Sequence, residues 1–381
     1  MQNSAKILFV SENAHWGGSE LLWTKTVVEL ISKNVEIMVC VSPKLELPKW
    51  FLEYETQNKF EIKRLSTSKL SKVNSILNRF LPYKFQFKAT NIRNQFVLDY
   101  QPDLVVINQG YNFNSVAFMA FCNQSKLKYV TISHAVNESF WPDLHLRKKM
   151  ILGFNKSQQN YFVSQDNLTV TQSQLGCALK NSQVIRNPFN VPFDINLEYP
   201  KNKNFQLACV GRLDFKSKGQ DILLRVLALE KWKTRNIVVN FYGEGEDLEN
   251  LKDLINFYEI KNAFIHHHQE TSKIWEHNQA LILTSRFEGL PIVLVEAMLC
   301  NRFGIMTNVS GNRELITDNI DGFIAQAPRI EYVDQALERA WSNKDQWEKI
   351  GKLARINLLK KIPQNPALEF SNELFDVLTN L

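Results

Sequence analysis

A nine-residue run, EGLPIVLVE, begins at Glu288 and ends at Glu296, and it combines two carboxylates with a glycine and a proline. A strand-like apolar segment, 281–285, precedes the run, and apolar residues continue it as a helix. Pro291 fits the first turn of that helix, and Gly289 lets the backbone approach a ligand closely. N–H groups at a helix start attract anions, and carboxylates accept hydrogen bonds from hydroxyls. The run therefore predicts a site for a ligand that carries phosphate and hydroxyl groups; the plainer alternative is a helix with a capping carboxylate and an exposed glutamate.

A second candidate segment carries two cations. Gly211 and Arg212 end an apolar segment that is typical of a strand, and Lys218 follows six residues later. Loops at the carboxyl ends of parallel strands line the crevice in which open α/β sheets bind ligands. A guanidinium binds phosphate through two hydrogen bonds, and an ammonium group adds a point charge. Both side chains are therefore candidate ligands for the phosphates, although basic loop residues are common and carry little weight alone.

Short apolar runs alternate with amphipathic segments along the whole chain. This alternation predicts parallel β-α-β units and an α/β fold with helices on both faces of each sheet. The expected strands are 7–10, 35–41, 104–107 and 129–132 in the first half, and 205–211, 237–242, 263–266, 280–284 and 303–306 in the second. The expected helices include 19–31, 114–123, 220–230 and 291–299.

The pattern restarts after residue 200, which predicts two similar domains. Three prolines lie within residues 187–204, where they favour an extended linker. We expect an N-terminal domain at 1–190, a C-terminal domain at 200–365 and a terminal helix at 366–381 that crosses back to the first domain.

The run from Glu288 to Glu296 resembles the E-x7-E motif of GT-B glycosyltransferases, and the whole set of motifs resembles the retaining glycosyltransferase family 4, also called group 1. The resemblance is clear over residues 205–325 and fainter in the first half. The matching segments are GRL at 211–213, KG at 218–219, YGEG at 242–245, SRF at 285–287, SGNRE at 310–314, DGF at 321–323, GGSE at 17–20 and VIRNP at 184–188.

The resemblance implies a GT-B fold, in which two doubly wound Rossmann-like domains face each other across a cleft. It places a nucleotide sugar on the C-terminal domain and an acceptor on the N-terminal domain. By position, Arg212 and Lys218 would neutralise the diphosphate leaving group, Glu288 would hold the donor sugar, and Glu296 would hold the ribose hydroxyls. The backbone of the donor loops would bind phosphate or sugar oxygens at Gly211, Gly289, Leu290, Pro291 and Ile292.

Two features of the first half extend the expected site. Gly17 and Gly18 follow the first strand, where a glycine turn would let backbone N–H groups face the donor phosphates from the opposite wall. The alternative is a tight strand-to-helix turn without a ligand. His134 follows the strand 129–132, where the family often places a histidine near the reacting carbon of the donor. It would contact the donor sugar or the acceptor, unless it has a purely structural role.

The turn after the E-x7-E helix departs from the family pattern, and a run of three histidines does not have the geometry of a metal site. The turn after the E-x7-E helix lacks the usual Gly-x-Pro, and we consider whether Arg302 in this altered turn faces the donor. Three histidines stand together at 266–268, but successive residues of a strand point to opposite faces, so they cannot all bind one ion. We expect no metal site and no cofactor.

Composition and charge set the remaining expectations. Five scattered cysteines without a CxxC pair argue against a disulfide framework or a zinc knuckle, and no apolar stretch approaches about 18 residues. The net charge of +6 over 381 residues gives no reason to expect nucleic acid. Residues 59–93 hold nine basic residues and one acidic residue, with apolar residues at helical spacing. This segment is either an ordinary helix packed on the domain or a basic amphipathic helix on an anionic membrane.

We therefore expect a metal-independent glycosyltransferase of the hexosyltransferase type that retains the anomeric configuration. Its donor would be a UDP- or GDP-type nucleotide sugar, and its acceptor a glycan or a lipid-linked glycan. Its place would be the cytoplasm or the inner face of the membrane, in the synthesis of surface polysaccharide or another glycoconjugate. Two alternatives stay open: a nucleotide-sugar epimerase of the same fold, and a catalytically silent partner that binds nucleotide sugar.

Overall fold

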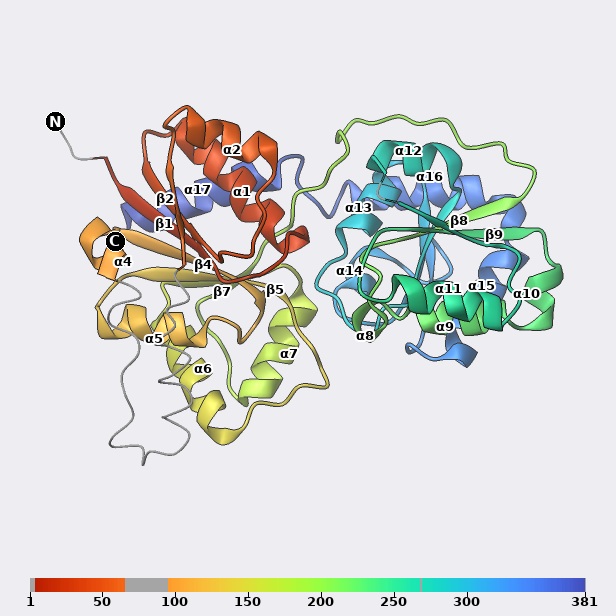
Figure 1. Cartoon of the computed structure of the whole chain (residues 1–381), viewed down its shortest axis with the longest axis horizontal. Coiled ribbons are helices and arrows are strands. Elements are labelled where there is room, and N and C mark those ends of the chain that lie inside the picture. The colour runs from red at the N-terminus through yellow and green to blue at the C-terminus, as the bar shows by residue number, and fades with distance from the viewer. Residues whose placement is uncertain (1–3, 66–94, 268, 381) are drawn as a thin grey trace.

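The computed structural model describes residues 4–65, 95–267 and 269–380, and its first domain is built on a seven-stranded parallel sheet. The strand order is β3-β2-β1-β4-β5-β6-β7, and helices cover both faces (Figure 1). The elements are β1 (Lys6–Ser11), α1 (Gly18–Ile31), β2 (Glu36–Val41), α2 (Lys49–Thr56), β3 (Glu61–Arg64), α4 (Gln95–Tyr100), β4 (Leu104–Tyr111), α5 (Val116–Gln124), β5 (Tyr129–Ala135), α6 (Leu144–Lys156), β6 (Gln159–Phe162), α7 (Gln165–Leu175) and β7 (Ser182–Val184).

Successive residues of the central strand β1 pack into two separate apolar layers. Ile7 and Phe9 lie in a cluster with Trp23 of α1, whereas Leu8 and Val10 lie in the opposite cluster, built on α5, α6 and α7. Because side chains alternate along a strand, a continuous apolar run marks a strand that is buried on both faces. The run that predicted this strand therefore forms the middle of the first domain.

The second domain repeats the design with six parallel strands in the order β10-β9-β8-β11-β12-β13. Its elements are β8 (Phe205–Val210), α8 (Phe215–Lys218), α9 (Gln220–Leu227), α10 (Glu230–Thr234), β9 (Ile237–Tyr242), α11 (Leu248–Phe257), β10 (Ala263–His266), α12 (Thr271–His277), β11 (Ala280–Leu283), α13 (Ile292–Leu299), β12 (Phe303–Thr307), α14 (Asn312–Leu315), β13 (Gly322–Ala325), α15 (Ile330–Ser342), the 3-10 turn Lys344–Gln346 and α16 (Trp347–Leu358). The predicted α/β class with two doubly wound domains is confirmed.

The last helix, α17 (Pro366–Thr379), leaves the second domain and packs on the first (Figure 1). Its start is fixed by Asn365, whose side chain accepts a hydrogen bond from the Leu368 N–H at 3.1 Å and donates one to Glu29 of α1 at 2.9 Å. The ring of Phe370 meets that of Tyr161 edge to face, with centroids 4.9 Å apart. The chain therefore crosses between the domains twice.

The segment 59–93 differs from the expectation at its beginning. Residues 61–64 form the edge strand β3, not part of a helix, and pair in parallel with β2. The rest of the predicted basic helix lies outside the described residues. Within the described ranges, each helix is too short or too polar to cross a bilayer.

Candidate active site

The candidate residues lie where the carboxyl ends of the two sheets face each other. In the second domain, the short helix α8 after β8 ends at Lys218, and the loop after β11 carries Glu288; these two strands are neighbours at the point where the strand order reverses. In the first domain, the loop after β1 carries Gly17, and β5 carries His134 near its end. This is the position at which open α/β sheets bind ligands.

Lys218 and Glu288 form a close ion pair at this position. The Lys218 Nζ lies 2.6 Å from Glu288 Oε1, and the two side chains are 25% and 8% exposed. Ser285 donates a hydrogen bond to the same carboxylate oxygen at 2.7 Å. Gly219 fixes the lysine, because its φ is +64° and a Cβ there would lie 2.2 Å from the Thr284 carbonyl oxygen. Only glycine permits this turn, which holds the end of α8 against β11.

Arg212 lies beside this pair and faces solvent. Its side chain is 54% exposed, and Nη2 is 3.2 Å from Asp214 Oδ2. The preceding Gly211 has a φ of +151°, a conformation that favours glycine. A Cβ at Gly211 would contact the Lys218 side chain at 3.8 Å, so this glycine adjoins the ion pair. Because the guanidinium itself is more than half exposed, it is free to turn from Asp214 toward an anionic ligand.

The start of α13 touches the first domain directly. A Cβ at Gly289 would lie 1.7 Å from the His134 carbonyl oxygen, and a Cβ at Gly18 would lie 2.8 Å from the Ile292 side chain. Leu290 is buried, and Pro291 is the residue before the helix rather than its first helical residue. The first N–H groups of α13 have no partner within the helix, so they remain available to an anion.

His134 belongs to a buried polar network in the first domain. Its Nε2 lies 2.8 Å from Asn108 Oδ1, which can only accept, so Nε2 carries the proton. The amide of Asn108 is oriented by its own donations to Ser11 at 3.2 Å and to Glu20 at 3.4 Å. Burial lowers the pKa of His134 to about 3, with a smaller opposing effect of the Asn187 side chain. The ring is therefore neutral, with its lone pair on Nδ1.

Glu20 anchors this network from α1. It is fully buried and accepts hydrogen bonds from Asn13 at 2.7 Å, Ser19 at 2.5 Å and Ser11 at 3.3 Å. Burial raises the pKa of Glu20, and these donors oppose the shift. The GGSE segment thus contributes a structural carboxylate in addition to its two glycines. Gly17 is extended, with a φ of −172°, and a Cβ there would meet nothing within 4 Å.

Glu296 lies one turn into α13, buried against the linker between the domains. Its Oε1 accepts hydrogen bonds from the backbone N–H of Asn190 at 2.8 Å and from the Asn190 side chain at 2.9 Å. Burial raises the pKa of Glu296 to about 7, although the Asn190 donors and the charge of Lys25 oppose the rise. This carboxyl group therefore gains and loses its proton near neutral pH.

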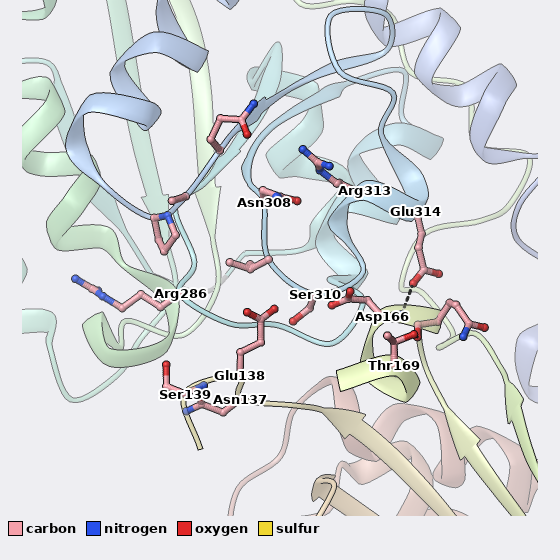
Figure 2. A pocket seen from close by; sticks show the side chains of 15 residues that line it. Asn137, Glu138, Ser139, Asp166, Thr169, Arg286, Asn308, Ser310, Arg313 and Glu314 are labelled. Atoms are coloured by element: carbon pink, nitrogen blue, oxygen red, sulfur yellow. Dashed lines mark hydrogen bonds between the residues drawn. The ribbon is translucent and has the colours of Figure 1, made fainter. Parts of the chain in front are cut away.

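A polar cavity of about 700 Å³ is lined by residues of both domains. Glu138 and Asp166 line it from the first domain, and Arg286, Ser310 and Arg313 line it from the second (Figure 2). Burial and mutual repulsion with nearby acidic groups raise the pKa values of Glu138 and Asp166. The cavity meets the ion-pair site through Ser310, whose Oγ accepts a hydrogen bond from the Glu288 N–H at 3.2 Å.

An interdomain ion pair closes one end of this cavity. Glu314 of α14 lies 2.9 Å from Arg186 and accepts a hydrogen bond from the Asp166 N–H at 3.1 Å. Figure 2 shows Glu314 reaching toward Asp166 from the second domain. Carboxylates, hydroxyls, amides and guanidinium groups thus line this cavity.

The structure brings most of the predicted site residues together, with two exceptions. Gly211, Lys218 and Glu288 adjoin one another, and Gly289 joins them to His134. Glu296 lies apart from them, against the linker, where it binds Asn190. Arg302 does not face the donor site: it is fully buried, and it donates to backbone oxygens of Trp275 at 2.7 Å and Asn278 at 2.9 Å.

Sequence reasoning missed several polar residues that support the site. Asn108 and Ser11 lie on adjacent strands, near the same ends as His134, and this pattern of polar residues could have been noticed. Asn190 lies in the linker, where no sequence pattern indicates its contact with Glu296.

His266, the first of the three consecutive histidines, stacks on Tyr242 with ring centroids 4.7 Å apart. In the described part of the chain, no group of three His, Cys, Asp or Glu residues has the geometry of a metal site.

Comparison with known proteins finds matches to the part of the chain that carries most of these motifs. Residues 194–356 match the family model described as glycosyl transferases group 1. An uncharacterized glycosyltransferase of Haemophilus influenzae is 30% identical over 169 residues, which cover 42% of this chain and 48% of that protein. A Campylobacter jejuni protein named as an α-1,4-N-acetyl-D-galactosaminyltransferase is 26% identical over 163 residues, 41% of this chain and 45% of that protein. The matched region spans just under half the length of these two relatives.

Solved structures match the whole chain. Anabaena HepE in complex with UDP-glucose has a TM-score of 0.73 and 17% identity, with 97% of this chain and 99% of that chain covered. The lipopolysaccharide outer core galactosyltransferase WaaB has a TM-score of 0.67 and 19% identity, with 97% and 99% covered. The chain therefore has the GT-B fold, and its second domain carries the sequence pattern of glycosyl transferases group 1.

Proposed function

We propose that the protein transfers a sugar from a nucleoside diphosphate sugar to an acceptor hydroxyl, with retention of anomeric configuration and without a metal ion. The observation that carries the proposal is the Lys218–Glu288 pair, 2.6 Å apart beside the start of α13. It combines a cation for the departing diphosphate with a carboxylate for sugar hydroxyls. Fixed charges at a leaving group are usually the largest single contribution to catalysis.

The proposed roles follow from the position of each group. Arg212 turns from Asp214 to the phosphates, and Lys218 supplies a second positive charge. Glu288 and Glu296 accept hydrogen bonds from the donor sugar and the ribose, respectively. His134 is neutral, so its Nδ1 accepts a hydrogen bond from a sugar hydroxyl rather than donating a proton.

The contact between the domains adds a step to this scheme. The Gly289 backbone and the His134 carbonyl oxygen leave no room between them even for a Cβ. A donor sugar that contacts both residues must therefore part the domains as it enters. Closure around the bound donor then excludes water, which would otherwise hydrolyse it.

The similar proteins support the donor and acceptor classes. HepE was solved with UDP-glucose and with UDP and glucose. The Campylobacter protein is named for an acceptor linked to undecaprenol through a diphosphate. We accordingly propose a UDP- or GDP-linked donor and a glycan or lipid-linked acceptor, in the synthesis of a surface polysaccharide or glycoconjugate.

The test measures release of nucleoside diphosphate from a panel of UDP- and GDP-sugars, with EDTA present, with and without a lipid-linked glycan extract. Acceptor-dependent release that is lost in an Arg212→Ala, Lys218→Ala variant supports the proposal. A donor that is converted to its epimer without acceptor indicates an epimerase instead. Donor binding without any turnover indicates a silent partner.

A further inference from the structure

Helix α6 of the first domain exposes apolar and cationic side chains on one face. Leu144 and Leu152 are 64% and 54% exposed, and Trp141, two residues before the helix cap, is 65% exposed. Leu144, Lys148 and Leu152 stand at four-residue intervals, so they share one face of the helix. Side chains of this size are seldom so exposed in a group unless the surface binds something.

The opposite face of α6 packs into the core of the first domain. Met150 and Phe154 are completely buried in the cluster beneath the sheet. A Cβ at Gly153 would lie 2.7 Å from the sulfur of Met119, which shows how closely α6 packs on α5. The helix start is also fixed, because the Asp143 side chain accepts a hydrogen bond from the Leu146 N–H at 2.8 Å. The exposed stripe is therefore held rigidly outward.

The charged side chains within α6 are all cationic, and exposed Asp143 caps the helix start. Four exposed cations lie on α6, and the helix itself contains no acidic residue; they are Arg147, Lys148, Lys149 and Lys156. Residues 1–190 contain 22 Lys and Arg against 13 Asp and Glu, a net charge of +9, whereas the remainder of the chain carries −3. Six of these cations lie in residues 66–94, outside the described residues, and the described part of residues 1–190 carries a net charge of +3.

We propose that α6 and Trp141 form a membrane-docking face that lies on an anionic lipid bilayer. An exposed Trp with leucines between lysines is the composition of helices that lie in the plane of a membrane interface. Each cation near such a surface contributes through attraction to anionic headgroups, and the apolar side chains enter the acyl boundary.

The location of this face relates it to the candidate site. Asn137 and Ser139 line the interdomain cavity, and Trp141 follows two residues later. Figure 1 shows α6 at the lower end of the first domain. If the proposed function holds, docking through α6 brings the cavity close to the headgroup layer, where a lipid-linked acceptor would lie.

The test is co-sedimentation of the full chain with phosphatidylcholine vesicles, with and without phosphatidylglycerol. We expect wild type to bind only the anionic vesicles, and added salt to weaken the binding. Lys148→Gln with Lys149→Gln should lower the partition coefficient about 30-fold, at about one factor of five for each cation. Trp141→Ala, Leu144→Ser and Leu152→Ser together should lower it roughly 100-fold or more.

Matched controls lie in the second domain. Lys261→Gln with Lys349→Gln removes two exposed cations, and Phe257→Ser removes an apolar side chain that is 75% exposed. Neither control should change vesicle binding, and thermal unfolding of every variant should match wild type because the altered side chains are exposed. Addition of anionic vesicles should shift Trp fluorescence to shorter wavelength in wild type but not in Trp141→Phe.

Three results would overturn the proposal: no binding of wild type to anionic vesicles, equal binding to neutral and anionic vesicles, or unchanged binding in both α6 variants. The last result would assign membrane contact to another surface. Because vesicle binding is measured without donor or acceptor, its failure leaves the proposed sugar transfer untouched. Conversely, a protein that binds vesicles through α6 but transfers no sugar would refute only the proposed function.

Discussion

Substitution of the buried carboxylate Glu296 by glutamine should stabilise the protein above neutral pH. Burial raises the pKa of this group from 4.5 to about 7 in the folded chain. Between these two values the folded state holds its proton more tightly than the unfolded state does, so the free energy of unfolding falls as pH rises. A separation of about 2.5 units at about 1.4 kcal/mol per unit predicts a loss of about 3 kcal/mol.

Glu296→Gln removes this loss while keeping the hydrogen bonds from Asn190, because the amide oxygen accepts them as the carboxylate does. The variant should match wild type near pH 4.5 and exceed its unfolding free energy by about 3 kcal/mol near pH 8. Burial of His134 has the opposite effect. Because its pKa is lowered from 6.5 to about 3 in the folded chain, the free energy of unfolding rises with pH between these two values. Both proteins contain this histidine, so the difference between them isolates Glu296.

The assay is urea unfolding followed by circular dichroism at several pH values, with the midpoint and slope compared between the two proteins. Glu249→Gln is the control, because that side chain is 76% exposed and its removal should cause no pH-dependent difference. Parallel stability curves for wild type and Glu296→Gln would refute the buried-carboxylate reasoning. If Glu296 also binds ribose hydroxyls, the more stable variant should bind nucleotide sugar more weakly, as functional carboxylates often do.

Three further predictions concern the surroundings of the site. Asn108→Ala removes the acceptor that keeps the ring proton of His134 on Nε2. Nitrogen NMR should therefore show one tautomer in wild type from about pH 5 to about pH 8 and a mixture of both tautomers in the variant. A single tautomer in both proteins would contradict the hydrogen-bond network. Gly289→Ala should hold the domains apart, because its Cβ cannot lie 1.7 Å from the His134 oxygen, and small-angle scattering should give a larger radius of gyration than wild type; an unchanged radius would mean that the contact is not formed in solution. Arg302→Met should lower the free energy of unfolding by at least about 3 kcal/mol, since several buried carbonyl groups lose their donor, yet leave the nucleotide affinity of the folded protein unchanged; a loss of affinity without destabilisation would restore a role at the donor site.

The sequence pattern placed Lys218 and Glu288 each after a predicted strand, and the family resemblance assigned both to the donor. The pairing of β8 with β11, which brings the two side chains together, is seen only in the fold. Continuous apolar runs identified strands β1, β2, β4, β5 and β8 to β12, since both faces of a parallel sheet are buried, whereas strands β6, β7 and β13 were not predicted. The short edge strand 61–64 was missed because its charged residues lack that signal, as is usual for edges.

Other parts of the site depend on tertiary geometry that no local pattern encodes. The position of Asn190 against Glu296 follows from the path of the linker between two domains. Arg302 looked available for a ligand because arginine is rarely buried, and only the fold reveals the carbonyl oxygens that surround it.

Calorimetric titration of UDP- and GDP-sugars in EDTA, into wild type and the single variants Arg212→Ala and Lys218→Ala, measures whether these two cations bind the donor diphosphate. We expect wild type to bind and each variant to bind about 10- to 100-fold more weakly, the value of one hydrogen bond to a charged group. Lys216→Ala is the matched control, because this exposed lysine of α8 lies outside the ion pair and should bind as wild type does. Equal dissociation constants in wild type, Arg212→Ala and Lys218→Ala would contradict the claim that these cations hold the diphosphate.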